Sequence, residues 1–306
     1  MTTGQPLAAL DVGSNTVRML IAKPRDGQLE QLADISQFVR LGKGVDAAGL
    51  LQSDRMDAAL AAIRALVSEA RERGVADVVA VATSAVRDAG NGQEFARMVG
   101  DVTGVGLRIL NGDDEARLTA LGALMGVAVE GTAMVCDLGG GSAEFVLASR
   151  DSVTWGKSLP LGSGRLTERF VHHDPPHADE VAALERHVDV LLGTLPPANP
   201  QLGVFTGGTA AHVASLAGSN DELTHMHTAE LLHIRNTVNS LPARSVIAKY
   251  GVAPERAQVL AAGISALAAV VTHYNIDHVV ITRHGIREGV LVDFLQREGT
   301  WQSNPK

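Results

Sequence analysis

Residues 8–22, AALDVGSNTVRMLIA, and residues 134–147, MVCDLGGGSAEFVL, share one plan. In each stretch an apolar run ends at an Asp-x-Gly sequence, passes through a short polar or glycine-rich turn, and continues as a second apolar run. Two strands joined by a tight turn produce this pattern. Because the plan appears near the start of each half of the chain, it predicts a duplicated domain.

Both turns suit the binding of an anion. The first offers backbone amides and short polar side chains that can face one phosphate, and it consists of Gly13, Ser14, Asn15 and Thr16. The second lets ligand oxygens approach a main chain without Cβ atoms, and it consists of Gly139, Gly140, Gly141 and Ser142. A third turn in FTGGTAA places Gly208 at the start of a helical pattern, where an anion or nucleotide is favoured. Each pattern is weak by itself, but together they predict a phosphate site.

Asp11 and Asp137 directly precede the two turns. A carboxylate in that position would repel a bare phosphate group. Mg²⁺ resolves the conflict, because it prefers one or two carboxylates together with phosphate oxygens and water.

Composition limits the possible partners. The chain has 306 residues, a net charge of −8, 45% hydrophobic residues and 3% aromatic residues, which argues against a basic field or aromatic platforms for nucleic acid. The apolar segment 259–271 is too short to span a membrane and reads as a buried helix. The single cysteine, Cys136, suits a reducing compartment and reads as a small buried residue. We therefore expect a cytoplasmic protein without nucleic-acid or membrane partners.

Strand-like and helical runs alternate along the whole chain, which is typical of an α/β protein. Predicted strands cover 7–12, 17–22, 28–39, 78–83, 107–110, 132–138, 143–149, 152–159, 202–206 and 278–282. One predicted helix starts at Ser53 and ends before Gly74. Further predicted helices cover 92–101, 113–126, 163–172, 178–194, 208–217, 228–240, 255–274 and 285–297. We expect domains at 1–128 and 129–306 with a cleft between them, and the last helix could pack back on the first domain.

The ordered motifs ALDVGSNTVRMLIA, ATSAVRDAGN, LNGDDEARLTALGA, VCDLGGGSAEFVL and SLPLGSGRLTERF resemble the exopolyphosphatase and guanosine pentaphosphate phosphohydrolase family. The similarity extends from about residue 8 to residue 295, and it resembles the short form without an appended C-terminal module. This family lies within the actin, hexokinase and Hsp70-like superfamily. The resemblance therefore implies two actin-like, ribonuclease H-like α/β domains and a phosphoanhydride hydrolase.

The resemblance also assigns roles to residues. The catalytic carboxylate of the family's Glu-Glu-Ala-Arg segment falls on Glu115, with Asp114 as a conservative departure, and the family's arginine falls on Arg87. The acids that bind the divalent metal fall on Asp137 and Glu144. The resemblance implies that Glu115 orients the attacking water and that Arg87 offsets developing charge.

Each of these residues also has a plainer interpretation. Glu115 could serve only the helix dipole, Glu144 could occupy a solvated edge position, and Arg87 could pair with Asp88. The segment ITRHGIREG contains Arg283, His284 and Arg287. These side chains could equally well lie at a solvated helix start or contact phosphate. A proline-rich surface loop is favoured over a metal site for His172, His173 and His177, and His225 and His227 are judged in the same way.

The expected reaction is the Mg²⁺-dependent release of orthophosphate from the ends of inorganic polyphosphate. Guanosine pentaphosphate is a possible second substrate, and a homodimer is left open. Two other classes also remain open: an ATP-dependent kinase or ATPase of the same superfamily, and a phosphate sensor without catalysis.

Overall fold

A computed structural model describes residues 4–149 and 152–298 of the chain, which divide into two compact units. The first unit contains residues 4–122 and 286–298, and the second contains residues 123–149 and 152–285. The division after Gly122 lies a few residues before the expected boundary after residue 128. The last described helix belongs to the first unit. The expected bounds 1–128 and 129–306, with a last helix that could pack back on the first domain, stay a prediction.

The first unit is built on a five-stranded sheet with the order β3-β2-β1-β4-β5. Its strands are β1 (Leu7–Val12), β2 (Thr16–Arg25), β3 (Gln28–Phe38), β4 (Asp77–Ala82) and β5 (Leu107–Ile109). Its helices are α1 (Val45–Ala48), α2 (Ser53–Glu72), α3 (Ser84–Asp88), α4 (Gly92–Thr103), α5 (Gly112–Ala123, whose last residue is assigned to the second unit) and α12 (Ile286–Arg297).

Side-chain alternation along β1 and β2 sends apolar residues to both faces of this sheet. One face carries Leu10 and Met19 and packs with α2 and α4 residues such as Ile63 and Phe95. The other face carries Leu7, Ala9 and Leu20, and it packs with Leu118 of α5 and with Val290, Leu291 and Leu295 of α12. The sheet is therefore covered on both sides, and α12 contacts β1 directly.

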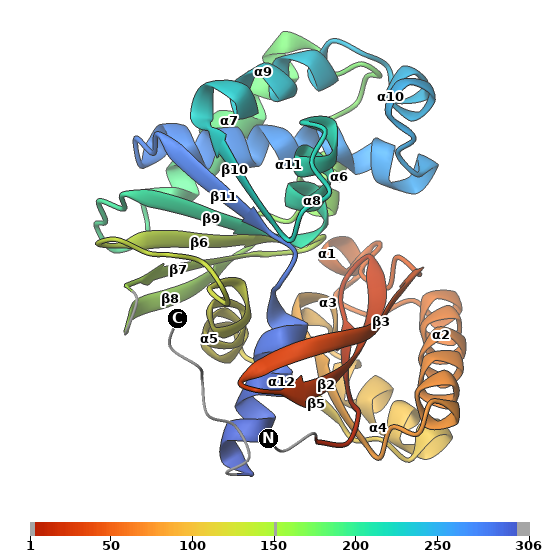
Figure 1. Ribbon diagram of the computed structural model, residues 1–306. Coiled ribbons are helices and arrows are strands. Elements are labelled where there is room, and N and C mark those ends of the chain that lie inside the picture. The colour runs from red at the N-terminus through yellow and green to blue at the C-terminus, as the bar shows by residue number, and fades with distance from the viewer. Residues whose placement is uncertain (1–3, 150–151, 299–306) are drawn as a thin grey trace. The chain divides into compact units, whose positions relative to one another are not determined.

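The second unit has a six-stranded sheet with the order β10-β11-β9-β6-β7-β8. Its strands are β6 (Ala133–Leu138), β7 (Ala143–Ala148), β8 (Val153–Leu159), β9 (Leu202–Thr206), β10 (Leu223–His227) and β11 (His278–Thr282). Its helices are α6 (Ser163–Phe170), α7 (Ala178–Leu192), α8 (Gly207–Leu216), α9 (Thr228–Asn239), α10 (Ala243–Tyr250) and α11 (Pro254–His273) (Figure 1).

The two sheets share one connectivity, as the duplicated sequence plan predicts. In the first, β1 pairs antiparallel with β2 and parallel with β4, and β2 pairs antiparallel with β3. In the second, β6 pairs antiparallel with β7 and parallel with β9, and β7 pairs antiparallel with β8. β10 extends the second sheet beyond this common order, because it pairs antiparallel with β11 at the edge.

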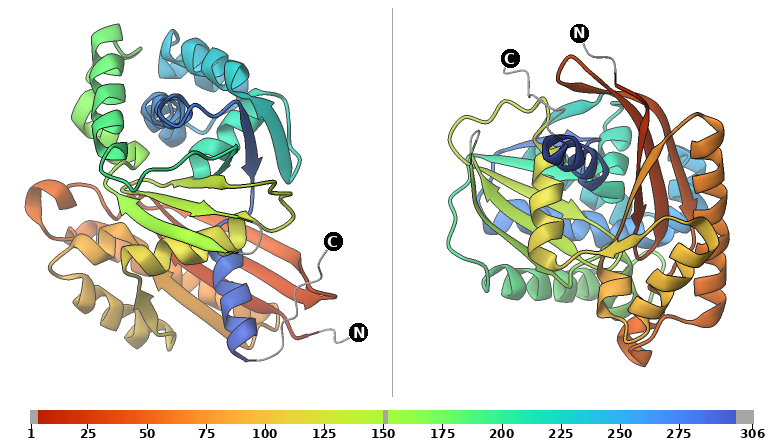
Figure 2. Two further views of the ribbon diagram at one scale, coloured as in Figure 1. Left: turned by 90° about the vertical axis from the view of Figure 1, so that its left-hand side faces the viewer. Right: turned by 90° about the horizontal axis from the view of Figure 1, so that it is seen from below.

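Helix α11 forms the centre of the helical layer of the second unit, and it contacts α6, α7, α8, α9 and α10. In the left view of Figure 2 it is seen nearly end-on. Among the described residues it is the one helix that is long and apolar enough to cross a membrane by length and composition, and 67% of an 18-residue stretch of it is buried inside the protein. The interpretation of 259–271 as a buried helix is therefore confirmed.

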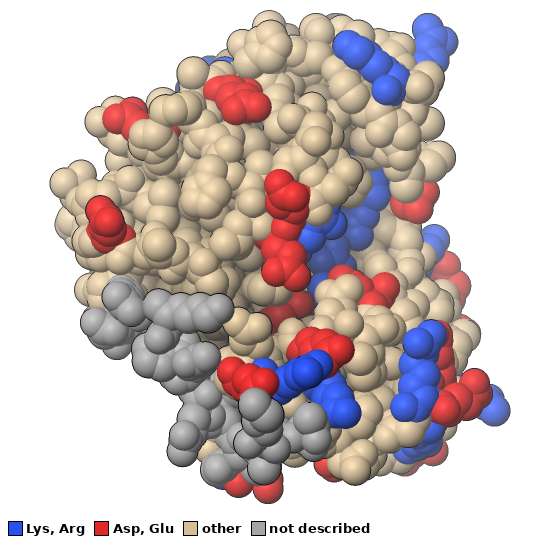
Figure 3. Space-filling view, viewed as in Figure 1, with Lys and Arg blue, Asp and Glu red and all other residues tan. Residues whose placement is uncertain are grey.

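Charged side chains of both signs are interspersed over the face of the molecule seen in Figure 3.

Candidate active site

The first Asp-x-Gly turn is a closed hairpin turn between β1 and β2. The amide of Gly13 donates to the Thr16 carbonyl over 3.0 Å, so this amide is used inside the turn. The Asn15 carbonyl accepts the amides of Val39 and Arg40, both over 2.9 Å. The Ser14 and Ser84 hydroxyls are hydrogen-bonded over 2.9 Å, which links the turn to the start of α3. Hydrogen bonds thus hold the turn to the segment after β3 and to the start of α3.

Two polar atoms beside this turn are buried without a hydrogen-bond partner, and they are Asp11 Oδ1 and Asn15 Nδ2. Burial raises the pKa of Asp11 above its usual value. The positive charges of Arg18 and Arg287 offset part of this rise in the pKa, and the negative charge of Glu288 adds to it. An unpaired buried acceptor and an unpaired buried donor are costly unless something binds them. Asp11 precedes the turn, where the sequence predicts a carboxylate accompanied by a divalent cation, although the predicted metal ligands were only Asp137 and Glu144.

Glu115 and Arg87 lie together in the first unit. Glu115 is on the first turn of α5, is 4% exposed, and accepts a short hydrogen bond from Arg87 Nη1. The same nitrogen reaches the Leu110 carbonyl at 3.4 Å, and Arg87 Nε lies 3.4 Å from Asp88 Oδ1. The structure thus brings together the two residues predicted as catalytic, and the pairing of Arg87 with Asp88 exists in addition.

Local sequence explains why Glu115 has this position. The Asn111 side chain accepts the amide of Asp114 over 2.8 Å, as an N-terminal cap does, and the Asn111 carbonyl accepts the amide of Glu115. Asp114, the departure from the family's motif, instead forms an ion pair with Arg108 at 2.8 Å. The two neighbouring acids therefore have different surroundings, and only Glu115 is buried.

The second Asp-x-Gly turn has the same closed form as the first. The Gly139 amide donates to the Ser142 carbonyl over 3.0 Å. The carbonyls of Gly139 and Gly140 accept amides from the start of α6, including those of Ser163 and Gly164. The amide of Gly139, like that of Gly13, is therefore committed within its turn, which limits the predicted phosphate cradle to the remaining groups of each turn.

Asp137 and Glu144 face each other in register on β6 and β7. Glu144 is 2% exposed, and its Oε1 accepts the hydroxyls of Ser142 and Ser158, each over 2.8 Å. The solvated edge position considered for Glu144 is therefore wrong, because β8 covers this edge of β7. The hydroxyl of Ser142, predicted to bind phosphate, orients Glu144.

Glycines make room for the Asp137 carboxylate. A Cβ on Gly207 would lie 2.4 Å from Asp137 Oδ1, and Gly207 has a φ of +89° at the start of α8. Gly285 also lies close, since its Cβ position is 4.0 Å from Asp137 Oδ2. The Gly208 carbonyl is 2.6 Å from His212 Nδ1 within α8. The third glycine turn therefore lies against the carboxylate of the second one.

Cys136 precedes Asp137 and is fully buried. Burial raises the pKa of its thiol well above the usual value, and the negative charges of Asp137 and Glu144 raise it further. The interpretation of this cysteine as a small core residue is confirmed, because such a thiol is a poor nucleophile.

In the segment ITRHGIREG, the side chain of Arg287 is buried, so the expected solvated helix start is wrong for this residue. This side chain is 7% exposed and forms a two-pronged ion pair with Asp34 of β3, with one contact at 3.1 Å. Arg283 is exposed and donates to the Asp221 carbonyl over 3.1 Å, and His284 Nδ1 is buried without a hydrogen-bond partner. Sequence reasoning missed the Asp34–Arg287 pair, because 253 positions separate its members.

The Ppx/GppA phosphatase family model matches residues 20–298. Exopolyphosphatase 1 of Mycobacterium tuberculosis is 31% identical over 95% of this chain and 89% of its own length. Exopolyphosphatase 2 of the same organism is 31% identical over 93% of this chain and 97% of its own length.

Among solved structures, a Ppx/GppA family member from Aquifex aeolicus has a TM-score of 0.82 and 29% identity, over 96% of this chain and 98% of that one. This likeness confirms the expected α/β fold with two actin-like domains. The chain therefore belongs to the Ppx/GppA phosphatase family.

Proposed function

We propose that the protein is an exopolyphosphatase that releases orthophosphate from the ends of inorganic polyphosphate. The observation that carries the proposal is that Glu115, the residue to which the resemblance assigns the role of catalytic carboxylate, is buried and held by Arg87. A buried carboxylate used only for the helix dipole would gain nothing from burial, because the dipole effect is also available at the surface.

Glu115 accepts the proton of the attacking water, and it orients the oxygen of this water toward the terminal phosphorus. Hydrolysis of a phosphoanhydride passes through a loose in-line transition state, so positioning of the water is the main task. The hydrogen bond from Arg87 fixes the carboxylate in one orientation. The positive charge of Arg87 also offsets charge that develops on the transferred phosphoryl group.

Phosphate groups are bound by the turn at 13–16 in the first unit and by the turn at 139–142 in the second. The unpaired Asn15 amide nitrogen is available to donate to a phosphate oxygen. In the first unit the other phosphate-binding residues are Gly13, Ser14 and Thr16. In the second unit they are Gly139, Gly140, Gly141, Ser142 and Gly208. Gly13 and Gly139 act by holding their turns closed.

The residues also fit a divalent cation such as Mg²⁺. Two acids directly opposite each other on neighbouring strands repel, and Asp137 and Glu144 occupy such positions. The carboxylate donor set is the one that Mg²⁺ prefers, and Asp137 and Glu144 would hold the ion directly or through water. The unpaired Oδ1 of Asp11 is a further oxygen of the same chemical type. A bound cation would neutralise part of the negative charge of the phosphate groups.

The test is phosphate release by the full chain with Mg²⁺ and, in separate reactions, polyphosphate, guanosine pentaphosphate and ATP. We expect release from polyphosphate, and loss of release in excess chelator. Preferential turnover of guanosine pentaphosphate would move the assignment to the 5′-phosphohydrolase within the same family. Much faster use of ATP would replace the proposal by the kinase or ATPase class, and binding without turnover would replace it by the sensor.

A further inference from the structure

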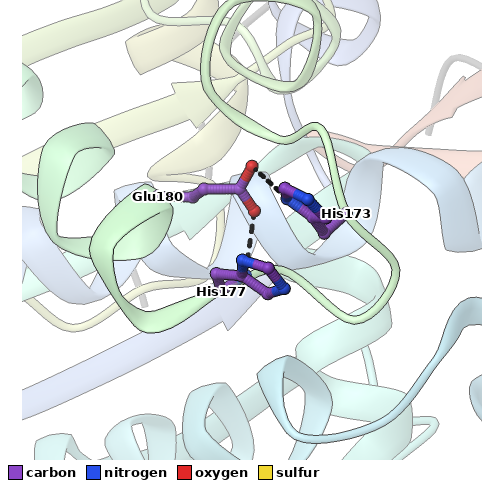
Figure 4. Close-up of side chains that lie close together, drawn as sticks. All are labelled: His173, His177 and Glu180. Atoms are coloured by element: carbon purple, nitrogen blue, oxygen red, sulfur yellow. Dashed lines mark hydrogen bonds and ion pairs between the residues drawn. The ribbon is translucent and has the colours of Figure 1, made fainter.

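Three side chains that the proposed reaction does not use gather at the start of α7. His173 and His177 come from the loop before the helix, and Glu180 comes from its first turn. The ligand atoms of the three residues all lie within 4.8 Å of one another (Figure 4). The loop predicted for VHHDPPH is confirmed by the structure, and the sequence spacing alone did not show that its histidines converge with Glu180.

Glu180 is held in place by hydrogen bonds to both of its oxygens. Oε1 accepts the His172 amide over 3.0 Å and faces His173 Nδ1 at 2.9 Å, and Oε2 accepts the His177 amide over 2.8 Å. Removal from water raises the pKa of this carboxyl, but the hydrogen bonds from His177, His173 and His172 outweigh that effect and lower the pKa to about 2. Glu180 is therefore a charged and oriented carboxylate.

The two imidazoles are close together, and both are exposed. Their rings stack with centroids 3.7 Å apart and an interplanar angle of 13°. The His173 side chain is 55% exposed, so its ring can turn toward solvent when it leaves the stack with His177. The loop backbone is anchored, because Asp174 Oδ1 accepts the amide of Ala243 at the start of α10 over 2.7 Å. The site therefore combines a fixed frame with adjustable ligands.

We propose that His173, His177 and Glu180 bind one transition-metal ion of the Zn²⁺ type. Two imidazoles and a carboxylate are a common three-residue donor set for Zn²⁺, with water in the fourth position. Imidazole donors favour Zn²⁺, Ni²⁺ and Cu²⁺ over Mg²⁺, which demands oxygen ligands. This ion is therefore chemically distinct from the cation of the proposed hydrolysis.

The required rearrangement is confined to the loop before α7 and the first turn of this helix. Bonds of about 2.0–2.1 Å in a tetrahedral site put the donor atoms roughly 3.4 Å apart, so the three ligand atoms need to approach by about one ångström or somewhat more. The rings leave the stacked arrangement, so that a nitrogen of each can point at one ion. This ion takes the place of the proton in the hydrogen bond between His173 and Glu180. The positive end of the α7 dipole opposes a cation, and the Glu180 charge offsets it. A bound ion would tie the loop at 171–177 to the first turn of α7.

The experiment measures Zn²⁺ binding to the full chain by titration calorimetry after removal of metals, in the presence of excess Mg²⁺. We expect one Zn²⁺ per chain from this site, and loss of affinity of roughly 10-fold or more in both His173→Ala and His177→Ala. Co²⁺ as a spectroscopic probe should give the visible absorption bands of a tetrahedral site in the original chain and not in these two variants.

Two matched variants serve as controls. His172→Ala removes the neighbouring exposed histidine, and His227→Ala removes one member of another histidine pair, whose rings lie 4.3 Å apart. Both should bind Zn²⁺ as the original chain does. Equal melting temperatures in chelator would show that the His173 and His177 variants fold. Absence of Zn²⁺ binding, full affinity in His177→Ala, or loss of affinity in His227→Ala would overturn the proposal.

Discussion

Asp137 faces Glu144 directly across the β6–β7 pair, so two acidic side chains occupy opposite register positions in one hairpin. Only Asp137 is partly exposed, whereas Glu144 is buried and accepts two serine hydroxyls. The pair is thus composed of one fixed carboxylate and one that is accessible to a ligand.

Replacing Asp137 by Asn should raise the Mg²⁺ concentration needed for half-maximal phosphate release. A direct ligand should matter at least as much as a supporting residue, whose loss costs roughly 10-fold or more in metal affinity. Mg²⁺ titration of the rate measures the effect. Asp101→Asn, the same chemical change at an exposed position of α4, is the control. An unchanged Mg²⁺ requirement in Asp137→Asn would remove Asp137 from the metal site.

Replacing Glu115 by Gln should lower kcat by roughly 10²-fold or more, because the amide cannot accept the proton of water. Polyphosphate binding should persist, because the phosphate turns are unchanged. Steady-state kinetics and a binding titration separate the two quantities. Asp114→Asn, at the neighbouring acid that pairs with Arg108, should keep most of the activity. A folded, fully active Glu115→Gln protein would contradict the mechanism.

The Arg87–Glu115 pair should show energetic coupling. Removing one partner of a buried ion pair costs about 3–5 kcal/mol, and partial exposure of Arg87 should place this pair at or below the low end. Urea unfolding of Arg87→Met, Glu115→Gln and the double variant gives the coupling free energy. We expect the double variant to lose less stability than the two single losses added together. Strict additivity would show that the contact has no energetic consequence.

Gly207→Ala should disturb Asp137, and Gly218→Ala provides a matched control. Both glycines have positive φ, +89° and +82°, so an alanine at either position costs about 1–2 kcal/mol in backbone strain. A Cβ on Gly218 meets nothing within 4 Å, whereas one on Gly207 meets Asp137 Oδ1 at 2.4 Å. Only Gly207→Ala should therefore also impair Mg²⁺ activation. Equal Mg²⁺ dependence in the two variants would argue against this contact.

The low pKa of Glu180 predicts a specific acid sensitivity. Because the folded-state pKa is lowered from 4.5 to about 2, Glu180 contributes stability above pH 4.5, and this contribution is lost as the pH falls toward 2. Glu180→Gln should therefore be less stable than the original chain at neutral pH, and the difference should shrink in acid. Chemical unfolding at several pH values in chelator measures it. A difference that does not change with pH would contradict the assignment.

Most elements were predictable from sequence, because strand and helix periods are clear around the glycine turns. The missed elements have identifiable reasons. Helices α1 and α3 have four and five residues, too few to show a helical period. Helix α10 had usable signals, since Pro242 precedes it and Gly251 ends it with a φ of +67°. Strand β10, LTHMH, has only a short alternation.

The site was predictable where motifs were local and not where the fold brings distant residues together. The register of Asp137 and Glu144 follows from the hairpin, so sequence spacing was enough. The role of Ser142 as a donor to Glu144, and the closure of both turns by the Gly13 and Gly139 amides, depend on three-dimensional hydrogen bonding. The Asp34–Arg287 pair has no sequence signature, and the Asp-x-Gly sequence marks Asp11 without showing that its Oδ1 is buried and unpaired.

The membership of α12 in the first unit bears on how the chain acquires its structure during synthesis. The second unit is one continuous stretch inserted within the first, whereas the apolar face formed by Leu7, Ala9 and Leu20 is covered by α12 residues near the end of the chain. Domains generally fold in the order in which the ribosome produces them. Here the first unit receives its last helix only after residues 123–285 have been synthesised, so the part of its β1 face that α12 covers stays exposed until then.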